Sequence, residues 1–437
     1  MLKKLLVWFV FFTSFSQAQI ASEKQRAEII DEILKDKFSN LLPELMERTG
    51  IDMWVLISRE YNEDPVLKTM LPATWLNARR RTILVFFKPA DSDTIEKLAV
   101  ARYNFGENIT SAWNKEKQPD QMQALASIIA ERDPKKIGLN YSDDFAIADG
   151  IVKTDYELFM TSLPEMYRKR VVSAIDLAIG WIETRTEMEM KFYENLVALT
   201  HEIIAEAFSN KVITPGVTTS EDVVWWLRQK VTDLGLETWF HPTIDIQRKE
   251  EELKDHIDAF SNGYGETVIL PGDLLHCDFG ISYLRLNTDC QQHAYVLKQG
   301  ETAAPRFLEE ALDKGNQLQD ILTSNFENGK SGNEILEASL TEAKLANLNP
   351  SIYTHPLGLY GHSAGPTIGM WDSQEGVPGT GDYKLFPNTA YAIELNNTVN
   401  IPEWNKDIRI MLEEAGFWGE SAFRYINKRQ TELILIP

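Results

Sequence analysis

Five side chains in the second half of the sequence carry atoms of the kinds that bind metal ions. They are four acids and one histidine, in the chain order Asp278, Asp289, His355, Glu394 and Glu413. Asp278 ends a strand-like apolar segment, and Glu394 lies in the apolar run from Ala390 to Leu395. A carboxylate in such a strand is costly to bury unless it is paired or bound to a metal ion. Each residue taken singly fits a turn, a cap or a hydrogen-bonded loop, so only the set indicates a metal site.

The charge of this set predicts how many cations it would hold. Four carboxylates bring a charge of −4, a neutral histidine adds none, and two divalent cations would balance them. Oxygen ligands with one imidazole suit manganese, our first expectation, as well as cobalt, zinc or iron. Two such ions could share a hydroxide whose lowered pKa makes it a nucleophile for an amide carbonyl.

The order of the five residues, at intervals of 11, 66, 39 and 19 positions, resembles a known ligand set. It is similar to that of the pita-bread metallopeptidases, the family of methionine aminopeptidase, prolidase and aminopeptidase P. The local contexts match as well, because His362 follows His355 by seven residues and Glu414 follows Glu413. The resemblance covers roughly residues 183–437. It implies an α+β pita-bread catalytic domain preceded by an α/β creatinase-type N-terminal domain.

This resemblance also implies a role for each residue. Asp278 would bind one metal ion, His355 and Glu394 the other, and Asp289 and Glu413 would bridge the two. Two of the residues would take part in catalysis. Glu394 would help manage the proton of the attacking water, and His362 would hydrogen-bond the substrate or the tetrahedral intermediate.

Three positions depart from the family pattern. The family usually has a histidine shortly before the first ligand, where this chain has Ser261, with His256 or His241 in the general region. Gln291 stands where the family usually has threonine, and Ser351 where its aminopeptidases often have another histidine. These departures concern substrate specificity rather than metal binding.

The strand register suggests what replaces the missing groups. If the two aspartates face each other on antiparallel strands, the numbers of paired residues sum to 567. His276 then lies opposite Gln291 on the metal side, and Cys277 lies opposite Cys290 on the reverse side. We predict that His276 and Gln291 tune Asp278 and the bound water from behind the ligands. A satisfied strand histidine without a catalytic role is the open alternative. The cysteines are expected as packed thiols rather than as a disulfide.

Other polar segments receive simpler interpretations. Residues 241–248 are expected to form a strand that lines the cleft, where His241 could touch substrate, although a structural role suffices for it. The acidic run 249–252 indicates a solvated surface. His201 and His293 are interpreted as structural.

The first half of the chain alternates between helical and strand-like patterns. Five segments have the apolar spacing of helices (22–48, 121–131) or strands (53–58, 82–87, 136–139). This alternation predicts an α/β domain over residues 19–180 with an architectural or substrate-gating role. Near its end, Thr186 and Glu189 have the spacing of a capping box, which begins a long helix reaching about Ala205. The second domain is expected to cover residues 181–437.

Residues 1–18 have the layout of a cleavable signal peptide. Lys3 and Lys4 precede an apolar run from Leu5 to Phe12, and small residues follow up to Ala18. The apolar run is shorter than the ~20 residues that span a bilayer. We expect cleavage near Ala18 and export to the periplasm or the medium, without a stable membrane anchor. A buried first helix is the alternative interpretation.

Composition excludes several classes of protein. The 44 basic and 65 acidic residues give a net charge of −21, which disfavours binding to nucleic acid. A hydrophobic content of 43% is ample for packed cores and excludes disorder as the dominant state. Only two cysteines are present, so stability must come from core burial rather than from disulfides.

The sequence therefore predicts an exported metallopeptidase that hydrolyses Xaa-Pro bonds at peptide N-termini or in dipeptides. Its partner would be a peptide with proline at the second position, and the resemblance implies a homodimer. A creatinase-like hydrolase of small carbon–nitrogen substrates is a second interpretation, disfavoured because such relatives do not keep the metal ligands. A non-catalytic peptide-binding module on the same fold is the third.

Overall fold

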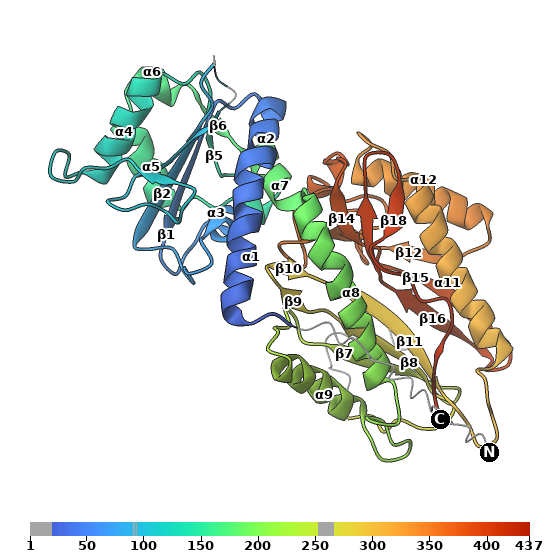
Figure 1. The fold of residues 1–437 in the computed structure, drawn as a ribbon. Coiled ribbons are helices and arrows are strands. Elements are labelled where there is room, and N and C mark those ends of the chain that lie inside the picture. The colour runs from blue at the N-terminus through green and yellow to red at the C-terminus, as the bar shows by residue number, and fades with distance from the viewer. Residues whose placement is uncertain (1–19, 91, 93, 252–265) are drawn as a thin grey trace, which may run out of the picture.

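The computed structural model describes residues 20–90, 92, 94–251 and 266–437. Figure 1 shows an N-terminal half built around one sheet and a C-terminal half of several sheets flanked by long helices. The expected signal peptide, His256 and Ser261 lie outside the described residues. No helix within the described ranges is long and apolar enough to cross a bilayer.

The N-terminal half is organised around a six-stranded sheet in the order β4-β3-β2-β1-β5-β6. Its strands are β1 (Met53–Arg59), β2 (Arg81–Phe87), β3 (Glu96–Ala99), β4 (Thr110–Ser111), β5 (Ile137–Leu139) and β6 (Val171–Ser173). The central strand β1 pairs antiparallel with β2 and parallel with β5. This mixed sheet with flanking helices confirms the α/β class expected of the first half.

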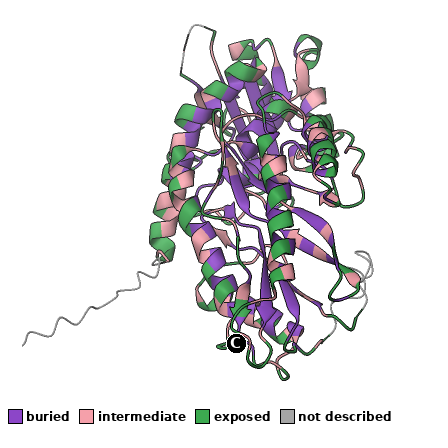
Figure 2. Ribbon diagram, turned by 90° about the vertical axis from the view of Figure 1, so that its right-hand side faces the viewer, coloured by how far each residue is buried: buried purple, intermediate pink, exposed green. Residues whose placement is uncertain are grey.

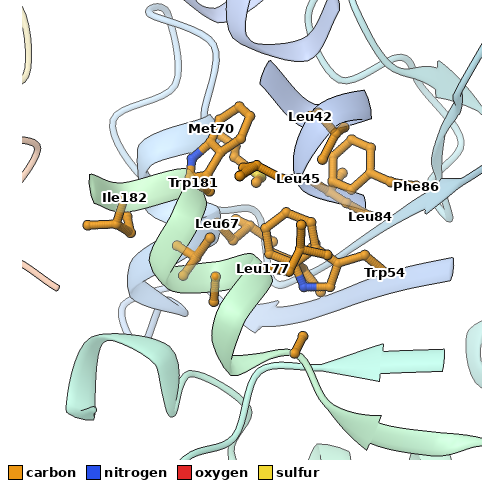
Figure 3. Close-up of a cluster of buried hydrophobic side chains, with 14 of the residues drawn as sticks. Leu42, Leu45, Trp54, Leu67, Met70, Leu84, Phe86, Leu177, Trp181 and Ile182 are labelled. Carbon is orange, nitrogen blue, oxygen red and sulfur yellow. The ribbon is translucent and has the colours of Figure 1, made fainter. Parts of the chain in front are cut away.

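Helices cover both faces of this sheet because β1 and β2 are apolar on both sides. The helices are α1 (Glu23–Asp36), α2 (Leu42–Thr49), α3 (Pro65–Met70), α4 (Gln121–Arg132), α5 (Lys153–Ser162), α6 (Glu165–Arg168) and α7 (Ile175–Glu183). On one face Trp54 and Phe86 pack against side chains of α2 and α7, among them Leu45 and Trp181 (Figure 3). On the other face Val55 and its neighbours pack against α4 and α5. Burying each such side chain contributes roughly 1.5–3 kcal/mol.

The first helix differs from the expected uninterrupted helix over residues 22–48. A π-helical segment, Lys37–Leu41, lies between α1 and α2. Lys37 is buried there, and its ammonium group donates to the carbonyl oxygens of Trp181 (3.1 Å) and Thr184 (3.3 Å). The helical bulge thus connects the first helix to the junction between the two halves.

Helices also organise the C-terminal half. The capping box of Thr186 and Glu189 is present and begins α8 (Glu187–Ala207), which packs with α9 (Ser220–Asp233) over the inner strands. Two further helices, α11 (Arg306–Ser324) and α12 (Gly332–Leu345), pack against the opposite sheet. Short 3-10 turns occur at Ala146–Ala148 and Thr380–Asp382.

Four sheets form the centre of this half in the part of the chain that the structure describes. The first is ordered β19-β11-β8-β7, with β7 (Thr243–Gln247), β8 (Leu274–Phe279), β11 (Cys290–Val296) and β19 (Ile434–Ile436). The second is ordered β12-β15-β16, with β12 (Pro350–Ile352), β15 (Leu395–Ile401) and β16 (Lys406–Leu412). The third is ordered β13-β14-β17-β18, with β13 (His355–Leu357), β14 (Thr389–Ala392), β17 (Ala415–Trp418) and β18 (Phe423–Tyr425). A short hairpin joins β9 (Ser282–Tyr283) to β10 (Leu286–Asn287). In Figure 2 the buried residues follow these strands through the molecule.

The predicted register between the two aspartate strands is wrong by two residues. Asp278 lies opposite Gln291, so paired numbers sum to 569 rather than 567, and Cys277 lies opposite Gln292 rather than Cys290. The β9–β10 hairpin has the same sum, with Tyr283 opposite Leu286. Both residues of its two-residue turn, at positions 284 and 285, have positive φ (52° and 67°), as in a type I′ turn. This turn therefore sets the register of the longer strands.

The two cysteines of these strands are buried free thiols. Both lie in the apolar cluster between α8 and the inner sheet. The expectation of packed thiols, rather than a disulfide, agrees with this arrangement.

Candidate metal centre

Each of the five expected ligands lies in or beside a β-strand, on segments that converge at the middle of the C-terminal half. Asp278 is on β8, and Asp289 directly precedes β11. His355 begins β13, Glu394 lies between β14 and β15, and Glu413 lies between β16 and β17. A backbone hydrogen bond from Gln291 N to Glu413 O (2.8 Å) ties the first sheet to the segment that carries Glu413.

These segments bring all five side chains together. His355 Nε2 lies 3.4 Å from Glu413 Oε1, 3.7 Å from Asp289 Oδ2 and 3.8 Å from Glu394 Oε2. Two groups have ligand atoms within 4.8 Å of one another, namely Asp278, Asp289 and Glu413, and His355, Glu394 and Glu413. Glu413 belongs to both groups, a position that suits a bridging ligand. The individual roles of the ligands stay predictions.

Several of the atoms that would bind metal have no hydrogen-bond partner. Among the described residues, Asp278 Oδ1, Asp289 Oδ1, His355 Nε2 and Glu413 Oε1 are buried and make no hydrogen bond. A buried polar atom without a partner costs about 1–3 kcal/mol, and a charged one costs more. Each of these atoms belongs to a residue in one of the two close groups, which is what a cation site requires, so the residues present fit divalent metal ions.

Burial pushes every member of the cluster towards its neutral form. It raises the pKa of Asp278 to about 7. Burial first, and then the charges of neighbouring acids, raises the pKa values of Asp289, Glu394 and Glu413 well above their usual range. Burial also lowers the pKa of His355 to about 3. A bound divalent cation would reverse this for the acids, since it favours their ionised forms.

His355 is held in the tautomer that a metal ligand needs. Its Nδ1 lies 3.0 Å from the carbonyl oxygen of Pro356, to which only an N–H can donate. The proton of the neutral ring is therefore on Nδ1, and Nε2 presents a lone pair to the three acids around it.

The amino-acid sequence over residues 192–414 matches the family model described as "Metallopeptidase family M24". The chain belongs to metallopeptidase family M24. This confirms the resemblance to the pita-bread enzymes and identifies the C-terminal half as the metallopeptidase domain. Members of the family depend on metal ions, in agreement with the cluster described above. No curated protein is similar enough in sequence to match this chain.

Several solved structures share the fold over almost the whole chain. The X-Pro aminopeptidase from Thermotoga maritima is 15% identical with a TM-score of 0.60, covering 89% of this chain and 99% of its own. The Xaa-Pro dipeptidase from Bacillus anthracis is 18% identical with a TM-score of 0.57, covering 95% and 100%. The prolidase from Pyrococcus horikoshii is 15% identical with a TM-score of 0.55, covering 91% and 99%. At such identities the likeness establishes the fold, including an α/β domain before the M24 domain.

The second histidine, His362, lies at the edge of the cluster of expected metal ligands. Its ring meets that of His355 edge-on at 4.8 Å between centroids, and it forms a third group within 4.8 Å with Asp289 and His355. His362 is exposed, whereas the ligands are buried or half-buried. It is therefore placed to contact a molecule that enters the centre, and its catalytic role stays a prediction.

Trp239, which borders His362, is not among the site residues that the sequence predicts. The two rings are 5.2 Å apart and nearly perpendicular, and Trp239 Nε1 donates to the carbonyl oxygen of Thr288, next to Asp289 (2.9 Å). A Cβ atom on Gly361 would lie 2.4 Å from the indole, so a glycine is required there. No metal-ligand spacing points to Trp239. The aromatic pair with Phe240, just before the expected cleft strand, was the available clue.

The prediction that His276 lies opposite Gln291 is wrong, because in the shifted register His276 lies opposite His293. The two side chains nevertheless meet. His276 Nε2 lies 3.0 Å from Gln291 Oε1. Gln291 Nε2 donates to Glu394 Oε1 (2.7 Å) and to Glu413 Oε2 (3.0 Å). The longer side chain at position 291 thus contacts two of the expected ligands.

His241 lies on the exposed turn before β7 rather than within a strand. Its ring contacts Trp225 of α9 at 5.3 Å, and Nδ1 lies 3.2 Å from Arg228 Nη1. These neighbours belong to α9 rather than to the ligand set. A substrate contact of His241 remains a prediction.

A neighbouring group, His201, Cys290 and Glu414, also brings ligand types together. Here the carboxylate is already satisfied, because Glu414 Oε2 lies 2.6 Å from His201 Nε2 and Oε1 accepts from Gln292 Nε2 (3.1 Å). The main-chain N–H of Gln430 also donates to Glu414 Oε1 (3.1 Å). This group therefore serves as a buried hydrogen-bond network, which agrees with a structural role for His201.

Proposed function

We propose that this M24 member is an exported exopeptidase that hydrolyses Xaa-Pro peptide bonds with two divalent metal ions, manganese first among them. The observation that carries the metal centre is the convergence of Asp278, Asp289, His355 and Glu413, each with a buried atom lacking a hydrogen bond. The Xaa-Pro preference is supported by structures of the same fold described as X-Pro aminopeptidase and Xaa-Pro dipeptidase.

In this proposal the side chains divide the chemical work. When bound, the metal ions would polarise the scissile carbonyl and lower the pKa of the attacking water. Glu394 Oε1 is engaged by Gln291, so Oε2 is the oxygen left to accept a proton from the water and return it to the leaving nitrogen. His362, exposed beside His355, would hydrogen-bond the developing charge on the carbonyl oxygen.

A substrate panel tests the proposal. Purified protein is analysed for bound metal, loaded with Mn²⁺, and incubated with Xaa-Pro-Yaa tripeptides, Xaa-Pro dipeptides and proline-free controls. We expect cleavage of proline-containing peptides only, and the tripeptide-to-dipeptide ratio assigns the aminopeptidase or dipeptidase type. If no peptide is cleaved while two ions per chain are verified, the non-catalytic peptide-binding alternative takes the place of the proposal.

Export and assembly are separate parts of the proposal. We expect the mature protein to begin after Ala18, outside the cytoplasm, which N-terminal sequencing of the protein from its native compartment checks. Retention of Met1 would contradict it. We expect a homodimer, which light scattering coupled to gel filtration measures, and a mass near 50 kDa per particle would contradict that expectation.

A further inference from the structure

A line of hydrogen-bonded side chains runs behind the ligands. Asp245 on β7 lies next to His276 on β8, with Asp245 Oδ2 and His276 Nδ1 3.0 Å apart. His276 Nε2 is 3.0 Å from Gln291 Oε1 on β11. Gln291 Nε2 then donates to Glu394 at 2.7 Å and to Glu413 at 3.0 Å. Three neighbouring strands thus place one side chain each between the β7 edge of the sheet and two expected metal ligands.

The direction of these bonds follows from the chemistry of the groups. Only the amino end of Gln291 can donate to two carboxylates, so its oxygen must face His276. An amide oxygen can only accept, so His276 Nε2 donates to it. The orientation of Gln291 is therefore fixed at both ends, by two acceptors on one side and a donor on the other.

Packing holds this line of side chains in place. His276 and Gln291 are buried residues, each 3% exposed, and the ring of His293 lies 5.2 Å from that of His276. His293 is itself anchored to the main chain, because its Nδ1 lies 3.0 Å from Leu275 O and its Nε2 accepts from Met411 N (3.0 Å). Asp245, with a side chain 13% exposed, is the outer end of the line.

We propose that Asp245, His276 and Gln291 form a positioning relay that fixes Glu394 and Glu413 in the orientation needed to bind metal ions. By occupying Glu394 Oε1 and Glu413 Oε2, the relay leaves Glu394 Oε2 and Glu413 Oε1 facing His355. This inference rests on the proposed metal centre and names residues that support it without contacting substrate.

Mn²⁺ binding, measured by the EPR signal of the free ion, tests the relay without using activity. Gln291→Met keeps the length of the side chain and removes both donors. We expect it to weaken Mn²⁺ binding about 10- to 100-fold, the range known for groups that hydrogen-bond metal ligands. Gln292→Met is the matched control, because Gln292 is also buried on β11 but donates to Glu414, outside the ligand set. We expect its Mn²⁺ affinity to stay within about 2-fold of wild type.

A double-mutant cycle separates a relay from independent contacts. Asp245→Asn at the outer end is expected to weaken Mn²⁺ binding as well, by less than Gln291→Met. In the Gln291→Met background the same change is expected to have no further effect, because the connection is already broken. Additive losses would overturn the relay, as would unchanged affinity in both single variants.

The outcomes distinguish the relay from the proposed function. If Gln291→Met fails to fold, as judged by circular dichroism, Asp245→Asn alone decides, and wild-type affinity in that variant overturns the relay. If wild-type protein itself binds no Mn²⁺, the metal centre is contradicted. If wild-type protein binds Mn²⁺ and the variants bind it equally well, the relay is contradicted and the metal centre is not.

Discussion

At the residue scale, the chemistry of the centre depends on a conflict between charge and burial. Four acids cluster in two groups that share Glu413, and their pKa values are raised because an ionised carboxylate is poorly solvated there. The same burial lowers the pKa of His355, which keeps its lone pair available. Burying these acids together is unfavourable without metal, and bound cations would remove that cost.

Replacing Asp289 by Asn should separate stability from activity. The change removes an acid that is costly to ionise next to Asp278 and Glu394, so we expect the metal-free protein to unfold at the same or a higher temperature. Activity should fall by at least about 100-fold, since a ligand contributes no less than the groups behind it. Calorimetry in a chelator and peptide turnover in Mn²⁺ measure the two effects. Retained turnover would remove Asp289 from the ligand set.

At the element scale, the junction between α7 and α8 carries an unusual number of buried charges. Arg185 donates to Glu189 (3.1 Å), and Lys37 from the π-helical segment lies 3.5 Å from the same carboxylate. Glu183, at the end of α7, lies 3.8 Å from the guanidinium of Arg48 and feels the charge of Arg185 at longer range. These two glutamates, on neighbouring helices, should respond to substitution in opposite ways.

Glu189→Gln is expected to destabilise the protein. Burial by itself would raise the pKa of Glu189, but Arg185 and Lys37 outweigh it and hold that pKa below its usual range. The variant leaves Lys37 and Arg185 buried without their counter-charge, which costs about 3–5 kcal/mol. Urea unfolding at pH 7 measures the loss. An unchanged midpoint would show that the two cations find other partners.

Glu183→Gln is the contrasting case, and its effect should depend on pH. Burial raises the pKa of Glu183 to about 8, despite Arg48. Between its ordinary pKa of 4.5 and about 8, the folded state holds more protons than the unfolded state, so this residue lowers stability as pH rises through that window. We expect the variant to lose this dependence and to exceed wild type at pH 8 by a few kcal/mol, on the order of 1.4 per pKa unit. Urea unfolding at pH 5 and pH 8 checks this, and parallel wild-type and variant curves would contradict it.

At the scale of the whole molecule, metal binding should be linked to folding. The ligands come from five segments in or beside β-strands, spread over positions 278–413, so the site exists only in the folded state. Ions that bind only the folded state stabilise it by about 2.7 kcal/mol at 100 times the dissociation constant.

Removal of the metal should therefore lower the unfolding temperature of the entire chain. We expect the transition in a chelator to shift down by several degrees and to recover when Mn²⁺ is added back. Differential scanning calorimetry measures both steps, with Mg²⁺ in excess as the control for ionic strength. A transition that does not respond to the chelator would contradict the linkage.

Much of the site could be predicted from the sequence because its signals are local or ordered. Glu394 follows an apolar run in which an acid is expensive, and the capping box at Thr186 depends on contacts three residues apart. The order of the five ligands along the chain indicated the family, and the family in turn predicted the fold of both halves. The helix over residues 22–48 was predicted except for its π-helical segment, because the burial of Lys37 depends on carbonyl groups about 145 residues away.

Only the tertiary structure decided how these segments meet. The strand register is shifted because Leu284 and Arg285 form a tight turn with positive φ, which their residue types do not suggest. That turn is stabilised from outside, with Leu284 buried and Arg285 donating to Thr69 O of the N-terminal half (3.0 Å). The types of the ligands and their order can be read from the sequence. The strand register and the neighbours of Gln291, in contrast, depend on contacts between distant segments.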